Sequence, residues 1–112
     1  MKQKINIKPL SVNKCWQGRR YKTPEYENYE TELLLLLKNL DIPHPPHKIN
    51  IQVGFSSKNA DIDNVLKPFL DILQKKYKFN DRHIYILNAE KIDVKKGNEF
   101  IDFEIKHLDL FF

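Results

Sequence analysis

The chain is organised around Asn59–Asp81, with the sequence NADIDNVLKPFLDILQKKYKFND. Two carboxylates, Asp61 and Asp63, stand two positions apart and are followed by Asn64; apolar residues then recur at helical spacing. Mg²⁺ prefers oxygen ligands and is usually held by a few carboxylates together with waters and substrate phosphates. The pattern therefore predicts a metal-binding acidic motif where a loop enters a helix.

Two simpler explanations compete with a metal site. Either carboxylate alone fits the N-cap of a helix, although both together exceed what capping needs. An EF-hand calcium loop is excluded because the glycine and the distal glutamate that it requires are absent. We expect Asp63 to be the N-cap and the helix to run to about Leu73, because Pro68 then lies near the first turn and removes a single hydrogen bond.

Lys67 and Asp71 continue the motif at intervals of four residues, so they project from the same side of the expected helix as Asp63. On an ordinary helix such a pair contributes only about 0.3–0.5 kcal/mol. Beside a metal-bound phosphate, Lys67 would stabilise developing negative charge, with Asp71 holding it in place. Asp81 is a third acid, which reaches the helix start only by a direct path; otherwise Asp81 or Lys67 acts across a dimer interface.

Composition limits the class of protein. The 112 residues are 41% hydrophobic and 30% charged, which fits one globular domain, and the net charge of +4 leans mildly toward polyanions. The single cysteine, Cys15, excludes an intrachain disulfide and fits a reducing compartment. The N-terminus lacks an apolar signal core, and no apolar run approaches the length of a membrane span. We expect a cytoplasmic, intracellular protein with no membrane partner.

Hydrophobic alternation predicts strands at about 4–8, 48–55, 84–94 and 99–108, the last two joined by a hairpin turn at 95–98. Thr23-Pro24-Glu25 predicts a helix start, with Thr23 as the N-cap. The expected buried stripe of that helix is Tyr26, Tyr29, Leu33, Leu36, Leu37 and Leu40. Leu35 lies on its other side, which favours a tightly wrapped core or a subunit interface. The predicted fold is α+β: a single small domain, residues 1–112, with a mixed four-stranded sheet and two main helices in the order β-α-β-α-β-β.

Basic residues mixed with aromatic ones flank both helices, a composition typical of segments that contact nucleic-acid phosphates and bases. The candidates are Arg19, Arg20 and Lys22 before the first helix, and Lys75, Lys76 and Lys78 at the end of the second. For the first group, a solvated loop anchored by Trp16 is an equally open alternative.

The core Asp61-Ile-Asp63-Asn64-Val-Leu-Lys67-Pro-Phe-Leu-Asp71, with Asn80-Asp81 after it, resembles the RusA family of Holliday junction resolvases, the crossover junction endodeoxyribonucleases. The segments Pro9–Asn13 and Arg20–Thr23 resemble that family's opening. Matching landmarks run from about residue 7 to residue 92, so the similarity covers most of the chain. The combination of these motifs is fairly specific for the family, whereas any one of them alone would be weak evidence.

The resemblance implies a Mg²⁺-dependent endonuclease, with Mn²⁺ as a substitute, that acts as a homodimer on four-way DNA junctions in recombination and repair and is often encoded by phages or prophages. Asp61, Asp63 and Asp81 match the family's metal-binding and catalytic acids, and Lys67 matches its essential lysine. Asn64 and Asp71 would support them, and Asn13 would join the DNA contacts. One departure is Asn80, because many members carry two adjacent acids there.

Two other functions stay open from the sequence. The first is a non-catalytic nucleic-acid-binding module, in which the acids cap a helix and pair with lysines. The second is a metal-dependent nuclease of the same chemistry that acts on other branched or single-stranded nucleic acid, since metal ligands do not encode the shape of a substrate.

Overall fold

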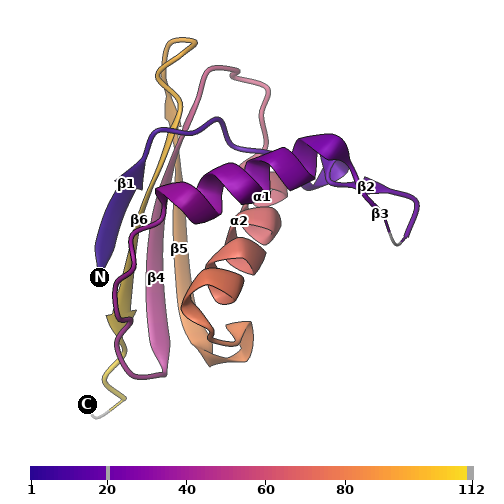
Figure 1. Cartoon of the computed structure of the whole chain (residues 1–112). Helices are drawn as coiled ribbons and strands as arrows, with labels where there is room; N and C mark the ends of the chain where they lie inside the picture. Colours follow the sequence, from indigo (N-terminus) through magenta and orange to yellow (C-terminus); the bar gives the residue numbers. More distant parts are fainter. Residues whose placement is uncertain (20, 111–112) are drawn as a thin grey trace.

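The centre of the sheet is β4 (His47–Phe55), whose side chains Ile49, Ile51 and Val53 are buried under the helices. The computed structural model describes residues 1–19 and 21–110. β4 is buried because it has a neighbour on each side and helices over one face, as its unbroken alternation of apolar residues requires (Figure 1).

Three further strands complete the sheet in the order β1-β6-β4-β5. β6 (Phe100–His107) pairs with β4 in antiparallel, and β1 (Lys2–Ile5) pairs with the far side of β6. β5 (Ile84–Asp93) pairs with β4 in parallel and forms the edge. The predicted α+β fold with a mixed four-stranded sheet and two helices is therefore confirmed.

The predicted hairpin between the last two strands is wrong, because β5 and β6 lie on opposite sides of β4. Gly97 does adopt a positive φ of 96°, so the chain turns where expected. After this turn, however, the chain crosses over β4 instead of pairing with β5. β5 already occupies one side of β4 in parallel, so β6 pairs with the other side. A local turn signal cannot distinguish these two connections.

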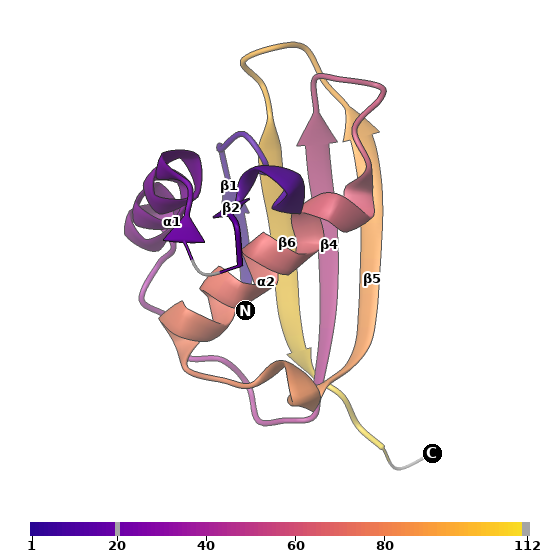
Figure 2. The same ribbon diagram turned by 90° about the vertical axis from the view of Figure 1, so that its right-hand side faces the viewer.

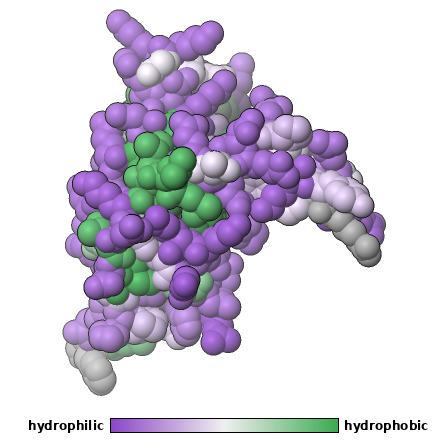
Figure 3. Space-filling view, viewed as in Figure 1, coloured by the Kyte–Doolittle hydropathy of each residue, from purple (hydrophilic) through white to green (hydrophobic). Residues whose placement is uncertain are grey.

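Helix α1 (Pro24–Leu36) begins as predicted: the Thr23 hydroxyl accepts a hydrogen bond from the Tyr26 amide at 3.1 Å. It ends earlier than its leucine pattern indicates, because Leu37 is extended. Leu36 and Leu40 are consequently about half exposed instead of buried, and Leu35 is 81% exposed. Figure 3 shows hydrophobic surface over this end of α1.

Helix α2 (Ile62–Tyr77) packs diagonally across the sheet (Figure 2). Its N-cap is Asp61 instead of the predicted Asp63, and it continues past Leu73 to a left-handed C-cap at Lys78 (φ 54°). Pro68 therefore lies deeper in the helix than expected. Buried side chains before and after it, among them Val65 and Phe69, hold the helix on the sheet, and their packing outweighs the lost hydrogen bond.

The basic segment before α1 also differs from the expected loop. After a short 3₁₀ turn, η1 (Val12–Lys14), the strands β2 (Trp16–Gln17) and β3 (Tyr21–Lys22) form a small hairpin that projects from the body of the molecule (Figure 1). Among the helices in the described part of the chain, none has the length and apolar character to cross a membrane.

Candidate active site

Asp61 occupies the N-cap position of α2 but does not cap it: its carboxylate makes no hydrogen bond to the amides of the first turn. Its Oδ2 instead lies 3.5 Å from the Asn64 side-chain amide, which donates to it. Asp63 is exposed in the first turn, and no hydrogen bond or ion pair of its side chain is found within residues 1–19 and 21–110. The capping explanation therefore does not account for either carboxylate.

The loop that leads into these acids is held by Lys91, near the end of β5. The Lys91 ammonium donates to the carbonyl oxygens of Lys58 at 2.8 Å and Ala60 at 2.6 Å. Sequence reasoning did not find this lysine, because its partners are backbone atoms more than thirty positions away. Lys91 fixes the approach to Asp61 and ties it to the carboxyl end of the edge strand.

Lys67 and Asp71 form the predicted ion pair along α2, with the ammonium nitrogen 2.9 Å from Asp71 Oδ1. The pKa of Lys67 is raised above its ordinary value, first by this hydrogen bond and further by attraction to the Asp71 and Asp81 carboxylates. Lys67 thus remains a cation near an exposed acidic surface, which is what a phosphate-binding role requires.

Asp81 is separated from the other two acids. It opens the 3₁₀ turn η2 (Asp81–His83), which follows α2 in the chain, and its amide donates to the side chain of Gln74 in the C-terminal part of α2 at 2.9 Å. Gln74 lies 11 positions after Asp63, which is about 16 Å along α2 at about 1.5 Å per residue. No group of three His, Cys, Asp or Glu residues in the described chain lies close enough to hold a metal ion. One chain therefore brings Asp61 and Asp63 to the same helix start but does not bring Asp81 to them.

Several predicted DNA-contacting lysines have structural partners. Both Lys22, at 2.8 Å, and Lys75 donate to the Glu30 carboxylate, whose side chain is only 13% exposed. Burial alone would raise the pKa of Glu30, but the hydrogen bonds from the two lysines outweigh it and lower that pKa. Lys76 donates to the Leu34 carbonyl oxygen at 3.2 Å. These contacts tie the hairpin and both helices together.

The other predicted contact residues lie at the surface. Asn13, Arg19 and Lys78 are exposed, and Arg20 lies outside the described residues. Positive charge for binding DNA is therefore available at the hairpin tip and at the end of α2, and η1 offers the neutral polar side chain of Asn13.

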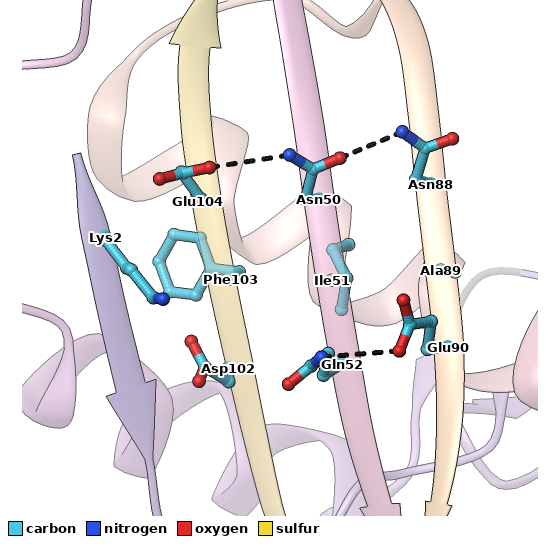
Figure 4. Close-up of a pocket in the computed structure, with 10 residues that line it drawn as sticks. All are labelled: Lys2, Asn50, Ile51, Gln52, Asn88, Ala89, Glu90, Asp102, Phe103 and Glu104. Carbon is cyan, nitrogen blue, oxygen red and sulfur yellow. Dashed lines mark hydrogen bonds between the residues drawn. The ribbon is translucent and has the colours of Figure 1, made fainter.

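The hollow on the other face of the sheet contains none of the predicted site residues (Figure 4). Its polar side chains bond to one another: Asn88 donates to Asn50 at 2.9 Å, and Gln52 donates to Glu90 at 3.3 Å. The candidate active site is instead the open surface around α2.

Exposed carboxylates at a helix start, with a lysine on the same helix, define a candidate for metal-assisted phosphodiester cleavage. The chain matches the family described as Endodeoxyribonuclease RusA over residues 7–104 and belongs to that family. Its members are endonucleases that act on Holliday junctions, which are branched DNA, and they generally depend on a divalent metal. No individual curated protein matches the chain.

Proposed function

We propose that the protein is a Mg²⁺-dependent endodeoxyribonuclease, with Mn²⁺ able to substitute, that resolves four-way DNA junctions by paired symmetric nicks. The observation that carries this proposal is the N-cap carboxylate of Asp61, which leaves its helix uncapped and stands beside the exposed Asp63. Carboxylate oxygens are the ligands that hard divalent cations prefer, so the residues fit the metal. We place the reaction inside a bacterial or phage-infected cell, with residues 1–112 as one catalytic domain.

Asp61, Asp63 and Asp81 would hold the metal. The chemistry that Mg²⁺ would supply there is polarisation of the scissile phosphate and a lowered pKa of a bound water. Lys67 stabilises the negative charge that develops on the phosphate oxygens, since its ammonium stays protonated and faces solvent. Asp71 positions that ammonium through the 2.9 Å hydrogen bond.

We assign the third acid to a second copy of the chain. β5 is the sheet edge, and it exposes Tyr85, Ile86 and Leu87. An exposed edge with apolar side chains is a template for pairing with another strand. Asp81 lies just before the start of this strand, while Lys91 near its end holds the loop before Asp61.

Antiparallel pairing of β5 with its symmetry mate lays the start of each strand against the end of the other. The partner subunit's Asp81 then lies on the side of Asp61 and Asp63, and both helix layers cover the same face of one continuous sheet. Leu35, Leu36 and Leu40 at the C-terminal end of α1 form a second exposed apolar surface among the described residues, but it does not include the strand that starts next to Asp81. A two-fold dimer would present two sites for nicks on symmetry-related strands.

The test is cleavage of a synthetic four-way junction beside a linear duplex built from the same arms, in Mg²⁺, Mn²⁺ or EDTA. Wild type is compared with Asp63→Asn and with Asp102→Asn, a matched substitution on the outer face of the sheet. Paired nicks on the junction alone, lost in EDTA and in Asp63→Asn but kept in Asp102→Asn, support the proposal. Equal cleavage of linear or single-stranded DNA would remove the junction specificity. Junction binding without cleavage in any metal would leave a binding module.

A further inference from the structure

The β2–β3 hairpin is not used by the proposed chemistry. It extends away from the sheet and beyond the N-terminal end of α1 (Figure 1). Its register pairs Trp16 with Lys22 and Gln17 with Tyr21. Directly opposed side chains share a face, and neighbouring ones alternate, so Trp16 and Lys22 lie on one face and Gln17 and Tyr21 on the other.

The face with Trp16 and Lys22 is fixed against α1. The Trp16 ring meets the Tyr26 ring edge to face, with centroids 5.7 Å apart, and the Lys22 ammonium lies 5.2 Å from the same ring centroid. Lys22 also donates to Glu30 at 2.8 Å. At the base of the hairpin, the Thr23 amide donates to the Cys15 carbonyl oxygen at 2.9 Å. The hairpin is therefore held against α1 by one of its faces and by its base.

The face with Tyr21 has no such partner. Tyr21 is 74% exposed, and no hydrogen bond or ring contact of its side chain is found in the described ranges. Burial and packing therefore do not explain an aromatic ring at this place. Two positions before Tyr21 in the chain, Arg19 is exposed in the same hairpin and supplies positive charge.

We infer that Tyr21 stacks on a base at the branch point of DNA and so contributes to the choice of branched over linear substrate. In a continuous duplex both faces of every base pair are stacked, whereas a branch interrupts the stack and leaves base faces open. Aromatic side chains stack on open bases with little sequence preference, and Arg19 would hold the neighbouring phosphates. This inference rests on the proposed function, because it names the part of the junction that the protein contacts.

The experiment measures binding in EDTA, so that its result does not depend on cleavage. The probes are a four-way junction with 2-aminopurine at the branch point and a linear duplex, both with loop-closed ends so that no terminal base pair is open. The variants are Tyr21→Ala, Tyr21→Leu and Tyr21→Phe, with Gln17→Ala as the matched control on the same hairpin face.

We expect Tyr21→Ala and Tyr21→Leu to weaken junction binding about tenfold, to leave duplex binding unchanged and to lose the fluorescence change of 2-aminopurine. Tyr21→Phe and Gln17→Ala should behave as wild type. The inference would be overturned if Tyr21→Ala weakened binding to the junction and to the duplex equally, or if Tyr21→Leu bound the junction as tightly as wild type. It would also be overturned if the wild type showed no preference for the junction over the duplex. If the protein discriminates the junction through Tyr21 but never cuts it, only the catalytic proposal fails.

Discussion

The carboxylate of Asp61 stands where a capping group would stand, yet within residues 1–19 and 21–110 the one hydrogen bond that it accepts is a 3.5 Å contact from the side chain of Asn64. We expect Asp61→Asn to change the free energy of unfolding by less than about 0.5 kcal/mol, as at an ordinary surface position. Junction cleavage in Mg²⁺ should fall at least about 100-fold, since a metal ligand matters at least as much as the groups that orient it.

Thr23→Ala is the control for Asp61→Asn, because the Thr23 hydroxyl does cap its helix at 3.1 Å. It should cost about 1 kcal/mol in urea unfolding and leave cleavage by the folded protein unchanged. If Asp61→Asn destabilises as much as Thr23→Ala while cleavage persists, Asp61 is a structural residue.

A second residue-scale prediction concerns the Tyr29 hydroxyl, which is buried without a hydrogen-bond partner in the described part of the chain. Burial raises the pKa of this phenol. Tyr29→Phe removes an unsatisfied polar group, so we expect stability to be unchanged or to rise by up to about 1 kcal/mol.

Tyr77→Phe is the matched comparison for Tyr29→Phe, because it breaks a 2.7 Å hydrogen bond to the Lys38 carbonyl oxygen and a 2.6 Å bond from Gln3. It should lower stability by about 1 kcal/mol. Both values are measured by urea unfolding, and an equal loss in the two variants would mean that Tyr29 is satisfied in solution.

At the scale of elements, Glu30 joins the β2–β3 hairpin to α1 and α2 through Lys22 and Lys75. Its pKa is lowered in the folded protein, because the two hydrogen bonds outweigh burial. Between the folded-state pKa and the higher unfolded-state pKa, the unfolded chain therefore binds more protons at this residue, and stability falls as pH falls. The stabilisation is fully present above the unfolded-state pKa and is lost as pH drops through the folded-state pKa.

We accordingly expect Glu30→Gln to lower stability at pH 7 by about 1 kcal/mol, a figure reduced by the exposure of both lysines. The variant should also lose less of its stability than wild type between about pH 5 and pH 3. Urea unfolding across this range measures both effects, with the exposed Glu32→Gln as control. Parallel wild-type and Glu30→Gln curves would contradict the assignment.

How far each element was predictable from the sequence depended on whether its signal was local. The start of α1 follows from Thr23-Pro24-Glu25, since capping acts within one turn. The start of α2 does not, because tertiary packing carries the helix through Pro68. The contacts of Glu30 and Lys91 were not predicted, because a single charge whose partner is distant in sequence leaves no pattern.

At the scale of the whole molecule, two exposed apolar surfaces in the described part of the chain are candidates for the interface of the proposed dimer, and paired substitutions distinguish them. Ile86 is 37% exposed on β5, and Leu35 is 81% exposed on α1, so a lysine at either position should leave the fold intact. A charge on an edge strand opposes strand pairing. We expect Ile86→Lys to be monomeric by sedimentation and inactive on junctions, whereas Leu35→Lys stays dimeric and active. The reverse pattern would move the interface to α1.

The separation of Asp81 from Asp61 and Asp63 leads to the most direct test of the two-chain site. Asp63→Asn and Asp81→Asn should each be inactive as homodimers. When they are unfolded together, mixed in equal amounts and refolded, half of the dimers are heterodimers. In a shared site, each heterodimer carries one site with both substitutions and one with neither.

About a quarter of all sites are then intact, as follows from random two-fold pairing. The mixture should regain nicking in Mg²⁺ but release mainly nicked junctions instead of resolved duplexes, because a single intact site cannot make the second, symmetric cut. If all three acids came from one chain, every site in the heterodimer would still carry one substitution, and the mixture would remain inactive. Refolded wild type and each variant refolded alone serve as controls. Activity in the mixture therefore assigns the partner subunit's Asp81 to the site, and its absence with active refolded wild type assigns all three acids to one chain.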